Sequence, residues 1–257
     1  MHKHAGTTIL KDLFQPGSLD TLFLDAGGVL VWPNWRRISL VLRDHGIKVD
    51  ADALAAADPM VRKKLDTPRE LAGLIDQQRS SRYYEMLLAQ AGVTLPLSQA
   101  AELALANLRH YHATENLWEY VPEFVPPALV ELRRMGLKLV VVSNANGTLV
   151  RAFHRLGLAP LVDVMLDSHE VGIEKPDRRL FDTALERSGA DRSTTIHVGD
   201  FYNIDVVGAR NAGLQAILVD QAGLYADADC PCIASIAELP ALVRPRDKRQ
   251  SAADSRG

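Results

Sequence analysis

Six charged or polar side chains lie in four short segments of this chain, and three of those segments directly follow an apolar run. They are Asp25, Ser143, Asn144, Lys175, Asp200 and Asp205. Together they supply a carboxylate nucleophile, a hydroxyl and an amide donor, a fixed cation, and acids that hold a hard cation. This set suits phosphoryl transfer, because donors and Mg²⁺ must stabilise the charge that develops on the phosphoryl oxygens. The residues predict one site at which the four segments meet.

Asp25 ends the apolar run 21–24 and is followed closely by Gly27 and Gly28. A buried parallel strand that presents one carboxylate at its carboxyl end and then turns sharply has this pattern. Ligands of open α/β sheets bind just beyond those strand ends. Aspartate is also common as a helix cap and in turns, so this stretch alone leaves both interpretations open.

The segments that would position these residues alternate between strand and helix patterns. Strands are predicted over 21–25, 138–143, 162–166, 195–199 and 215–219, and helices over 126–135, 149–156, 179–188, 204–212 and 236–243. Such alternation is typical of a parallel sheet with helices on both faces. We therefore predict an α/β fold with a Rossmann-like, doubly wound parallel sheet as its core.

A helical block without a clear strand interrupts this alternation between about residues 35 and 112. Its helices are predicted over 36–45, 51–57, 68–91 and 97–111. The block is expected to form an all-helical cap domain inserted into the core. The expected boundaries are an N-terminal extension over 1–19, a core over 20–33 and 116–243, a cap over 34–115, and a disordered polar tail over 244–257.

The composition is that of an ordinary globular protein, with 47% hydrophobic and 24% charged residues and a net charge of −3. This charge argues against a nucleic-acid or anionic membrane partner. No apolar run approaches the roughly 20 residues that span a bilayer, and the first residues do not resemble a secretory signal. Two cysteines, Cys230 and Cys232, are too close together in the sequence for a disulfide between them to stabilise the fold. A cytoplasmic location is expected, and the oligomeric state stays open.

Four motifs in one order resemble those of the haloacid dehalogenase superfamily, over roughly residues 20–243. They are Leu24-Asp25-x-Gly-Gly-Val-Leu30, Val142-Ser143-Asn144, Glu174-Lys175-Pro176-Asp177, and Val198-Gly199-Asp200 with Asp205 followed by Gly208 to Gly213. Each motif alone is weak, but four in the family's order at predicted strand ends are specific. The helical block falls where one subfamily carries its inserted cap.

The resemblance implies a role for each matching residue. Asp25 resembles the nucleophile that forms an aspartyl-phosphate. Asp25, Asp200 and the backbone carbonyl of Gly27 would ligate Mg²⁺. Asp205 would support the metal indirectly, through its ligands or through water. The remaining predicted roles are phosphoryl binding by Ser143 and Lys175, substrate contact or loop ordering by Asn144, and substrate binding by Gly27 and Gly28.

Gly27 departs from the family's phosphatase pattern, which has a second aspartate at this position. That acid protonates the leaving oxygen and then activates water, and such catalysis is typically worth about 10²–10⁴ in rate. The first hypothesis is an Mg²⁺-dependent phosphatase of a small phosphorylated metabolite, acting on anomeric, acyl or aryl esters that need little protonation. A water or a cap residue supplying the proton is a variant of this hypothesis.

Two other hypotheses stay open at this point. The enzyme would cleave a bond other than P–O, as dehalogenases or phosphonate-cleaving members do, with Lys63 or Lys64 as nominal Schiff-base candidates. Alternatively, the protein would bind a phosphorylated ligand or a partner without turnover. The acids Asp200 and Asp205 argue against a metal-free dehalogenase, and the intact nucleophile argues against a pure binder. The pair His110 and His112 is expected to lie at a half-exposed helix end.

Overall fold

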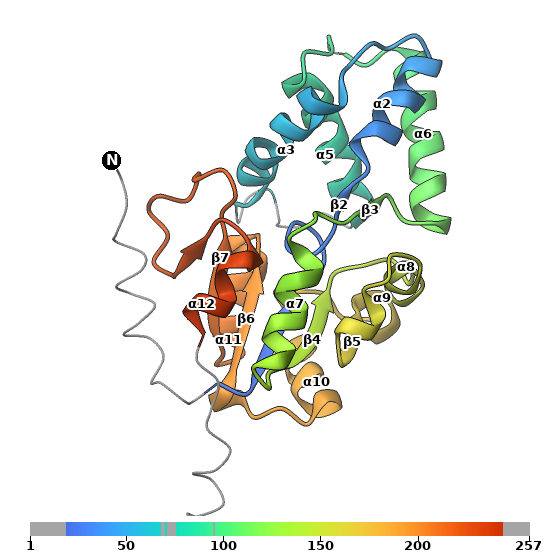
Figure 1. Ribbon diagram of the computed structural model, residues 1–257. Coiled ribbons are helices and arrows are strands. Elements are labelled where there is room, and N and C mark those ends of the chain that lie inside the picture. Colours follow the sequence, from blue (N-terminus) through green and yellow to red (C-terminus); the bar gives the residue numbers. More distant parts are fainter. Residues whose placement is uncertain (1–18, 68–69, 71–75, 95, 244–257) are drawn as a thin grey trace, which may run out of the picture.

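The computed structural model describes residues 19–67, 70, 76–94 and 96–243. A sheet-based core forms one part of the molecule, and a group of helices forms a second part over one edge of the sheet (Figure 1). The predicted N-terminal extension, apart from Leu19, and the predicted tail over 244–257 lie outside the described residues. The predicted fold class, a parallel sheet core with an inserted helical cap, is confirmed.

The core sheet contains six parallel strands in the order β5-β4-β1-β6-β7-β8. They are β1 (Thr21–Leu24), β4 (Lys138–Ser143), β5 (Val164–Asp167), β6 (Thr195–Gly199), β7 (Gln215–Val219) and β8 (Cys232–Ile233). The predicted strands over 138–143, 195–199 and 215–219 agree with the structure at both ends. β8 was not predicted, because a strand of two residues has no readable alternation.

Alternating side chains of the central strands enter two separate hydrophobic cores. Leu22 and Leu24 of β1 pack into one core, whereas Phe23 packs into the other on the opposite face. This division is expected of a strand whose successive side chains point to opposite faces. Both faces are buried, which explains why the strands consist of continuous apolar runs. The sheet is thereby fixed in register, and its carboxyl edge becomes a rigid platform.

Helices cover both faces of the sheet. They are α7 (Val125–Arg134), α8 (Leu149–Arg155), α9 (Ser168–Val171), α10 (Arg178–Ser188), α11 (Val207–Asn211) and α12 (Leu239–Leu242). The helix predicted over 204–212 begins as a π-helix, Tyr202–Val206, before α11. This wider turn directly follows β6 and carries Asp205. A π-turn is often found at a functional site.

The cap contains α2 (Trp35–Asp44), α3 (Ala51–Leu65), α5 (Asp76–Gln90) and α6 (Gln99–Thr114). Their apolar faces form a core of their own that includes Ile38, Leu54, Leu87 and Leu108. The prediction that one helix ends at residue 57 was wrong. α3 continues through Pro59 to Leu65, because packing of its apolar face outweighs the missing backbone donor. The helix predicted over 68–91 falls partly outside the described residues.

Two short strands carry the chain into and out of the cap. β2 (Trp32–Pro33) pairs antiparallel with β3 (Trp118–Tyr120). Glu119 ties this ribbon to the cap, since its carboxylate accepts hydrogen bonds from Asn34 at 2.9 Å, Arg37 at 2.7 Å and Tyr111 at 2.8 Å. The two crossings between core and cap are therefore joined into one structural unit.

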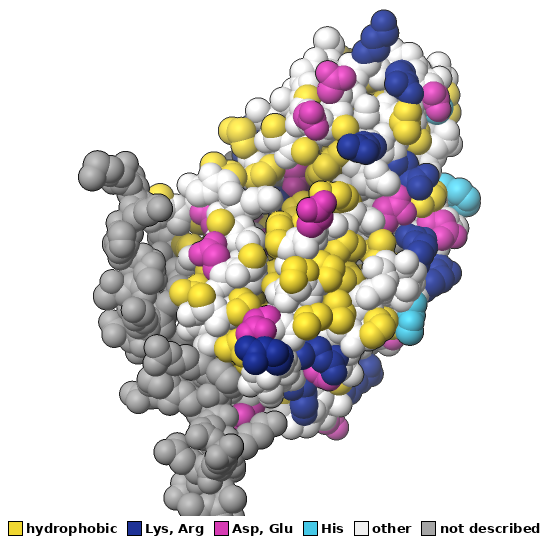
Figure 2. Space-filling model, in the orientation of Figure 1, with side chains coloured by type: hydrophobic (Ala, Val, Ile, Leu, Met, Phe, Trp, Pro, Cys, Tyr) yellow, Lys and Arg dark blue, Asp and Glu magenta, His cyan; other side chains and the backbone are white. Residues whose placement is uncertain are grey.

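The visible face in Figure 2 carries hydrophobic side chains gathered over α7 and charges of both signs scattered around them. Val130 of α7 contributes to the exposed apolar surface. In the part of the chain that the structure describes, no helix combines the length and the apolar character needed to cross a membrane.

Candidate active site

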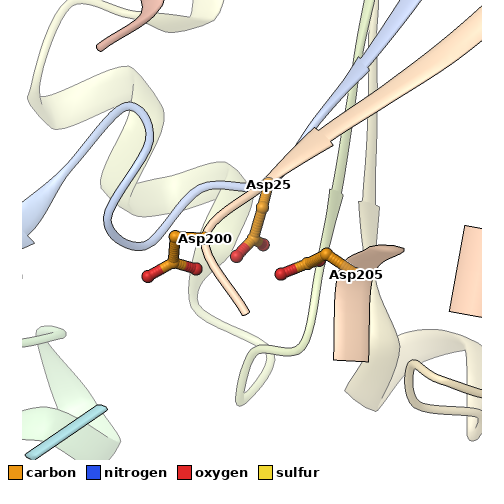
Figure 3. A group of neighbouring side chains, drawn as sticks. All are labelled: Asp25, Asp200 and Asp205. Atoms are coloured by element: carbon orange, nitrogen blue, oxygen red, sulfur yellow. The ribbon is translucent and has the colours of Figure 1, made fainter. Parts of the chain in front are cut away.

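The carboxyl edge of the sheet collects the polar residues that the sequence analysis selected. Asp25 directly follows β1, Ser143 ends β4, and Asp200 directly follows β6. Leu24 is in register with both Val141 and Val198, so these three strand ends lie side by side. The carboxylates of Asp25, Asp200 and Asp205 point toward a common space (Figure 3), and one ligand oxygen of each lies within 4.8 Å of the others.

Lys175 is the cation of this cluster and is only 3% exposed. Its Nζ lies 2.9 Å from Oδ1 of Asp25 and 2.6 Å from Oδ1 of Asp205. Asn144 holds the lysine loop, because its Oδ1 accepts from the backbone N–H of Lys175 at 2.7 Å and its Nδ2 donates to the carbonyl of Lys175 at 2.9 Å. Of the two roles expected for Asn144, this geometry favours loop ordering.

Both carboxylate oxygens of Asp205 are bound by neighbouring residues of the core. Its Oδ1 receives Lys175 and also lies 2.9 Å from Nε2 of His197, and its Oδ2 accepts the backbone N–H of Phe201 at 3.0 Å. With three donors already bound, this carboxylate is arranged to hold Lys175 in place. His197 packs against the ring of Phe181 and also orients Asp205.

Burial and charge shift the pKa values of these groups in different directions. Burial raises the pKa of Asp25, although Lys175 opposes the shift, and burial raises the pKa of Asp200 despite its pairing with Arg62. Burial would also raise the pKa of Asp205, but the charge of Lys175 and the hydrogen bond from His197 outweigh it and hold this pKa low. Burial therefore outweighs the neighbouring cation at Asp25 and at Asp200, whereas the partners of Asp205 outweigh burial.

Gly28 allows the loop after Asp25 to pass close to the acids. Its φ is +70°, a value that favours glycine, and its N–H donates to the carbonyl of Val31 at 2.9 Å. A Cβ at this position would collide with the side chains of Asp200 and Arg62. Any larger residue would therefore displace the carboxylate of Asp200, which explains the second glycine of the motif.

The cap contributes Arg62, which the sequence analysis did not select. This arginine of α3 pairs with Asp200 of the core and with Asp58 one turn earlier, at 2.9 Å from Nη2 to Oδ2. Tyr83 of α5 donates to the other oxygen of Asp58 at 2.7 Å. The i, i+4 spacing of Asp58 and Arg62 was the available signal. It was missed because the helix was predicted to end before Pro59.

Asp66 forms a second link between cap and core just after α3. Its carboxylate accepts the backbone N–H groups of Tyr202 at 2.6 Å and Asn203 at 2.9 Å, and the hydroxyl of Tyr225 at 2.6 Å. Neighbouring Lys63 lies over the Tyr225 ring, 3.5 Å from its centroid. The C-terminal end of α3 is therefore docked on the core, directly above the acids.

Gly27 faces an indole ring from the second crossing. A Cβ built on Gly27 would lie 3.0 Å from Nε1 and 3.3 Å from Cδ1 of Trp118. The position for which the family resemblance predicts a second aspartate is thus bordered by an aromatic side chain. The structure describes no positive φ at Gly27, so the indole, and not the backbone, restricts this position.

A cavity of about 560 Å³ lies between the cap and the carboxyl edge of the sheet. Asp25, Gly27, Gly28, Ser143, Asn144, Lys175, Asp200 and Asp205 all line it. The cap and the crossings add residues that sequence reasoning did not assign to the site, including Arg62, Tyr83, Arg109, His112 and Trp118. Neither Lys63 nor Lys64 is among the lining residues, and Lys64 instead bonds Gln90 at 2.9 Å.

The donor set fits a divalent cation. Oδ1 of Asp25 is buried and accepts no well-aligned hydrogen bond, so it is open to a metal ion beside its ion pair with Lys175. The linked ion pairs contain the carboxylates of Asp25, Asp58, Asp200 and Asp205 but only the cations Lys175 and Arg62. Mg²⁺ prefers carboxylate and carbonyl oxygens, which this edge of the sheet provides.

Comparisons with known proteins agree with this geometry. A model of the haloacid dehalogenase-like hydrolases matches residues 19–213. The glyceraldehyde 3-phosphate phosphatase of Methanothermobacter thermautotrophicus is 38% identical over 104 residues, which span 39% of this chain but only 45% of that protein. The haloacid dehalogenase-like hydrolase domain-containing protein 3 of Bos taurus is 32% identical over 181 residues, covering 69% of this chain and 71% of that protein.

A solved structure shares the fold over most of its length. The HAD-hydrolase YfnB of Bacillus subtilis, described in a magnesium-bound form, superposes with a TM-score of 0.64 at 18% sequence identity, covering 86% of this chain and 96% of the other. Its likeness shows the core and cap architecture alone. The family model and the relative from Bos taurus lead to one conclusion: the chain belongs to the haloacid dehalogenase-like hydrolases.

Proposed function

We propose that this hydrolase is an Mg²⁺-dependent phosphatase of a small phosphorylated metabolite, with Asp25 as the nucleophile. The observation that carries the proposal is the grouping of Asp25, Asp200 and Asp205 around one space, with the Nζ of Lys175 2.9 Å from the Asp25 carboxylate. Phosphatases among the relatives, which include the glyceraldehyde 3-phosphate phosphatase, support the same class of substrate.

Each residue has a defined task in the proposed reaction. An oxygen of Asp25 attacks phosphorus in line with the leaving oxygen, and an aspartyl-phosphate forms on Asp25 before water hydrolyses it. Ser143 and Lys175 donate to the phosphoryl oxygens, and stabilising their charge is most of the catalytic task. Asp25, Asp200 and the Gly27 carbonyl would hold Mg²⁺, which supplies further positive charge beside the phosphoryl group.

The alternative chemistries have less support. Phosphonate cleavage through a cap Schiff base requires a lysine in the cavity, and Lys175 is the only lysine that lines it among the described residues. A metal-free dehalogenase has no use for the buried acid Asp200 beside the nucleophile. A binder without turnover has no use for an Asp25–Lys175 pair at the base of a cavity.

The proposal is tested by phosphate release from a panel of aryl, anomeric, acyl and alkyl phosphates and by halide release from 2-haloacids. We expect phosphate release that requires Mg²⁺ and stops with a chelator. Asp25→Asn should abolish it, a loss of at least about 10⁴-fold, because the amide is a poor nucleophile. Asp52→Asn, an exposed position in α3, is the matched control and should retain full activity.

Two outcomes contradict this proposal. Chelator-insensitive halide release would establish a dehalogenase instead. Phosphate release that persists in Asp25→Asn would remove Asp25 from the role of nucleophile.

A further inference from the structure

We propose that the leaving group of the substrate is an aromatic ring carried on the ester oxygen, and that Trp118 positions it where other phosphatases place their second acid. This inference rests on the proposed phosphatase function and narrows its substrate class to aryl phosphate monoesters with an apolar body.

Trp118 occupies the space that a side chain at position 27 would need. Nε1 is the indole atom nearest to the Cβ position of Gly27, at 3.0 Å, and Cδ1 follows at 3.3 Å. Any side chain here would bring its Cβ into tight contact with the indole, which would have to shift by a few tenths of an ångström. Glycine and tryptophan are thus complementary, and the site contains an indole N–H in place of a carboxyl group.

The indole is held in a fixed position. The backbone N–H of Trp118 donates to Oδ1 of Asn116 at 2.9 Å, and Nδ2 of the buried Asn116 donates to Thr148 at 2.9 Å. Trp118 pairs with Pro33 in the β2–β3 ribbon, and the His112 ring packs against it with centroids 5.2 Å apart. The backbone of Trp118 is thus anchored and its ring is packed, so the indole can orient a ligand with little further loss of side-chain entropy.

The chemistry at this position selects for a good leaving group. As Asp25 forms its bond to phosphorus, the P–O bond breaks and the leaving oxygen keeps the bonding electron pair. The indole N–H is a hydrogen-bond donor that gives up no proton. A phenol has a pKa of about 10, so its oxygen departs as the phenolate and takes a proton from water. An alkoxide is far more basic and would need an acid.

The walls of the cavity match an aromatic body. Trp118 and Trp32 line it together with Pro33, Val31, Leu149 and Phe153, which come from the ribbon, the loop before it and α8. The volume of about 560 Å³ lies in the usual range for sites that enclose a small organic ligand. Offset or edge-to-face packing against the indole would add to the binding of an aryl group. Polar residues, including Asp58, Arg62 and Arg109 of the cap, line other parts of the same cavity, so the match to an aromatic body concerns the wall beside Trp118.

The first experiment compares kcat/KM for phenyl phosphate and glycerol phosphate at saturating Mg²⁺. We expect a preference for phenyl phosphate of about 10²–10⁴, the usual contribution of the missing acid. Trp118→Ala should raise KM for phenyl phosphate about tenfold. Trp118→Phe keeps an aromatic face, so its KM should stay close to the wild-type value. Tyr120→Ala changes an exposed residue of the same strand and should leave KM unchanged. Equal use of both esters, or an unchanged KM in Trp118→Ala, would overturn the inference.

A second experiment tests whether the indole of Trp118 prevents an acid at position 27 from acting in catalysis. Gly27→Asp alone should not increase the hydrolysis of glycerol phosphate, because Trp118 fills the space. Gly27→Asp combined with Trp118→Ala should increase it by at least tenfold over Trp118→Ala. Circular dichroism and thermal melting identify variants that fail to fold, and Gly27→Ala serves as the smaller probe. The same increase in Gly27→Asp alone would show that Trp118 does not control this position.

Binding separates this inference from the proposed function. The Asp25→Asn variant is expected to bind phenyl phosphate at least tenfold more tightly than glycerol phosphate by calorimetry, and Trp118→Ala in that background should remove the difference. If no ester is hydrolysed but this preference remains, the phosphatase proposal fails and the aromatic site stands. If phosphate is released but both ligands bind equally, the phosphatase stands and the aromatic site is refuted.

Discussion

Lys175 lies between two carboxylates at the base of the cavity, and its position depends on both. Asp25 and Asp205 keep its ammonium group charged, because their negative charges raise its pKa against the opposing effect of burial. His197 in turn binds Asp205 from below at 2.9 Å. This chain of contacts runs from the strand interior to the nucleophile and fixes the direction from which Lys175 can reach a phosphoryl oxygen.

Asp205→Asn tests this arrangement at the scale of one residue. The change removes the nearer of the two anions beside Lys175 and leaves only Asp25 to compensate its charge, so the unfolding free energy should fall, by less than the roughly 3–5 kcal/mol lost when a buried charge has no partner at all. Urea denaturation measures the loss. Lys175→Met in the same background should recover part of the lost unfolding free energy, because no buried ammonium group then remains to be compensated. Purely additive losses in the double variant would show that the two residues do not act as a pair.

At the scale of elements, the β2–β3 ribbon connects cap and core through Glu119. Its carboxylate is bound by groups from both sides of the crossing, including Arg37 of α2 and, at 3.3 Å, Arg155 of α8. Burial would raise the pKa of Glu119, but the hydrogen bonds from Arg37, Asn34 and Tyr111 outweigh it and lower the pKa below its ordinary value of 4.5.

A pH-dependent contribution to stability follows from this shift. Because the folded pKa is depressed, the stabilisation is present above pH 4.5 and is lost as the pH falls through the lower folded value. Glu119→Gln should therefore lower stability by about 1 kcal/mol at pH 7, with less effect at pH 3. Thermal melting at both pH values provides the measurement. An equal decrease at both values would mean that the charge of Glu119 is not the cause.

At the scale of the whole molecule, the end of α3 fastens the cap to the core. Asp66 is only 4% exposed and binds three donors of the core, while Arg62 reaches Asp200 across the cavity. These contacts hold the C-terminal end of α3 against the core beside the acids.

Asp66→Ala should loosen this docking by about 2–4 kcal/mol, since hydrogen bonds to a charged group are lost together. The three tryptophans, Trp32, Trp35 and Trp118, all lie at or beside the crossings, so their fluorescence reports on the cap. We expect stronger acrylamide quenching and a larger radius of gyration in solution scattering. Asp52→Ala, which is exposed on the same helix, should change neither. Wild-type quenching and a wild-type radius of gyration in Asp66→Ala would show that Asp66 does not hold the cap on the core.

The sequence alone determined the core and its reactive edge. Apolar runs such as 138–143 and 195–199 predicted strands to the residue, and the polar groups that follow them had to meet, because parallel strands present their carboxyl ends at one edge. This reasoning brought Asp25, Ser143 and Asp200 together without knowledge of distances, whereas Lys175 follows no strand directly and was selected as a fixed cation in its own motif. Periodicity and strand order are local or topological properties, so a sequence carries them directly.

The tertiary structure decided what faces that edge. Arg62 meets Asp200 across 138 positions of sequence, and Asp66 meets Tyr225 across 159. The indole of Trp118 reaches Gly27 only because the crossings pair as a ribbon. Such contacts depend on how the cap docks on the core, which is set by the packing of whole helices and by ion pairs between distant segments. No local pattern encodes that orientation, so the composition of the cavity was decided by the fold.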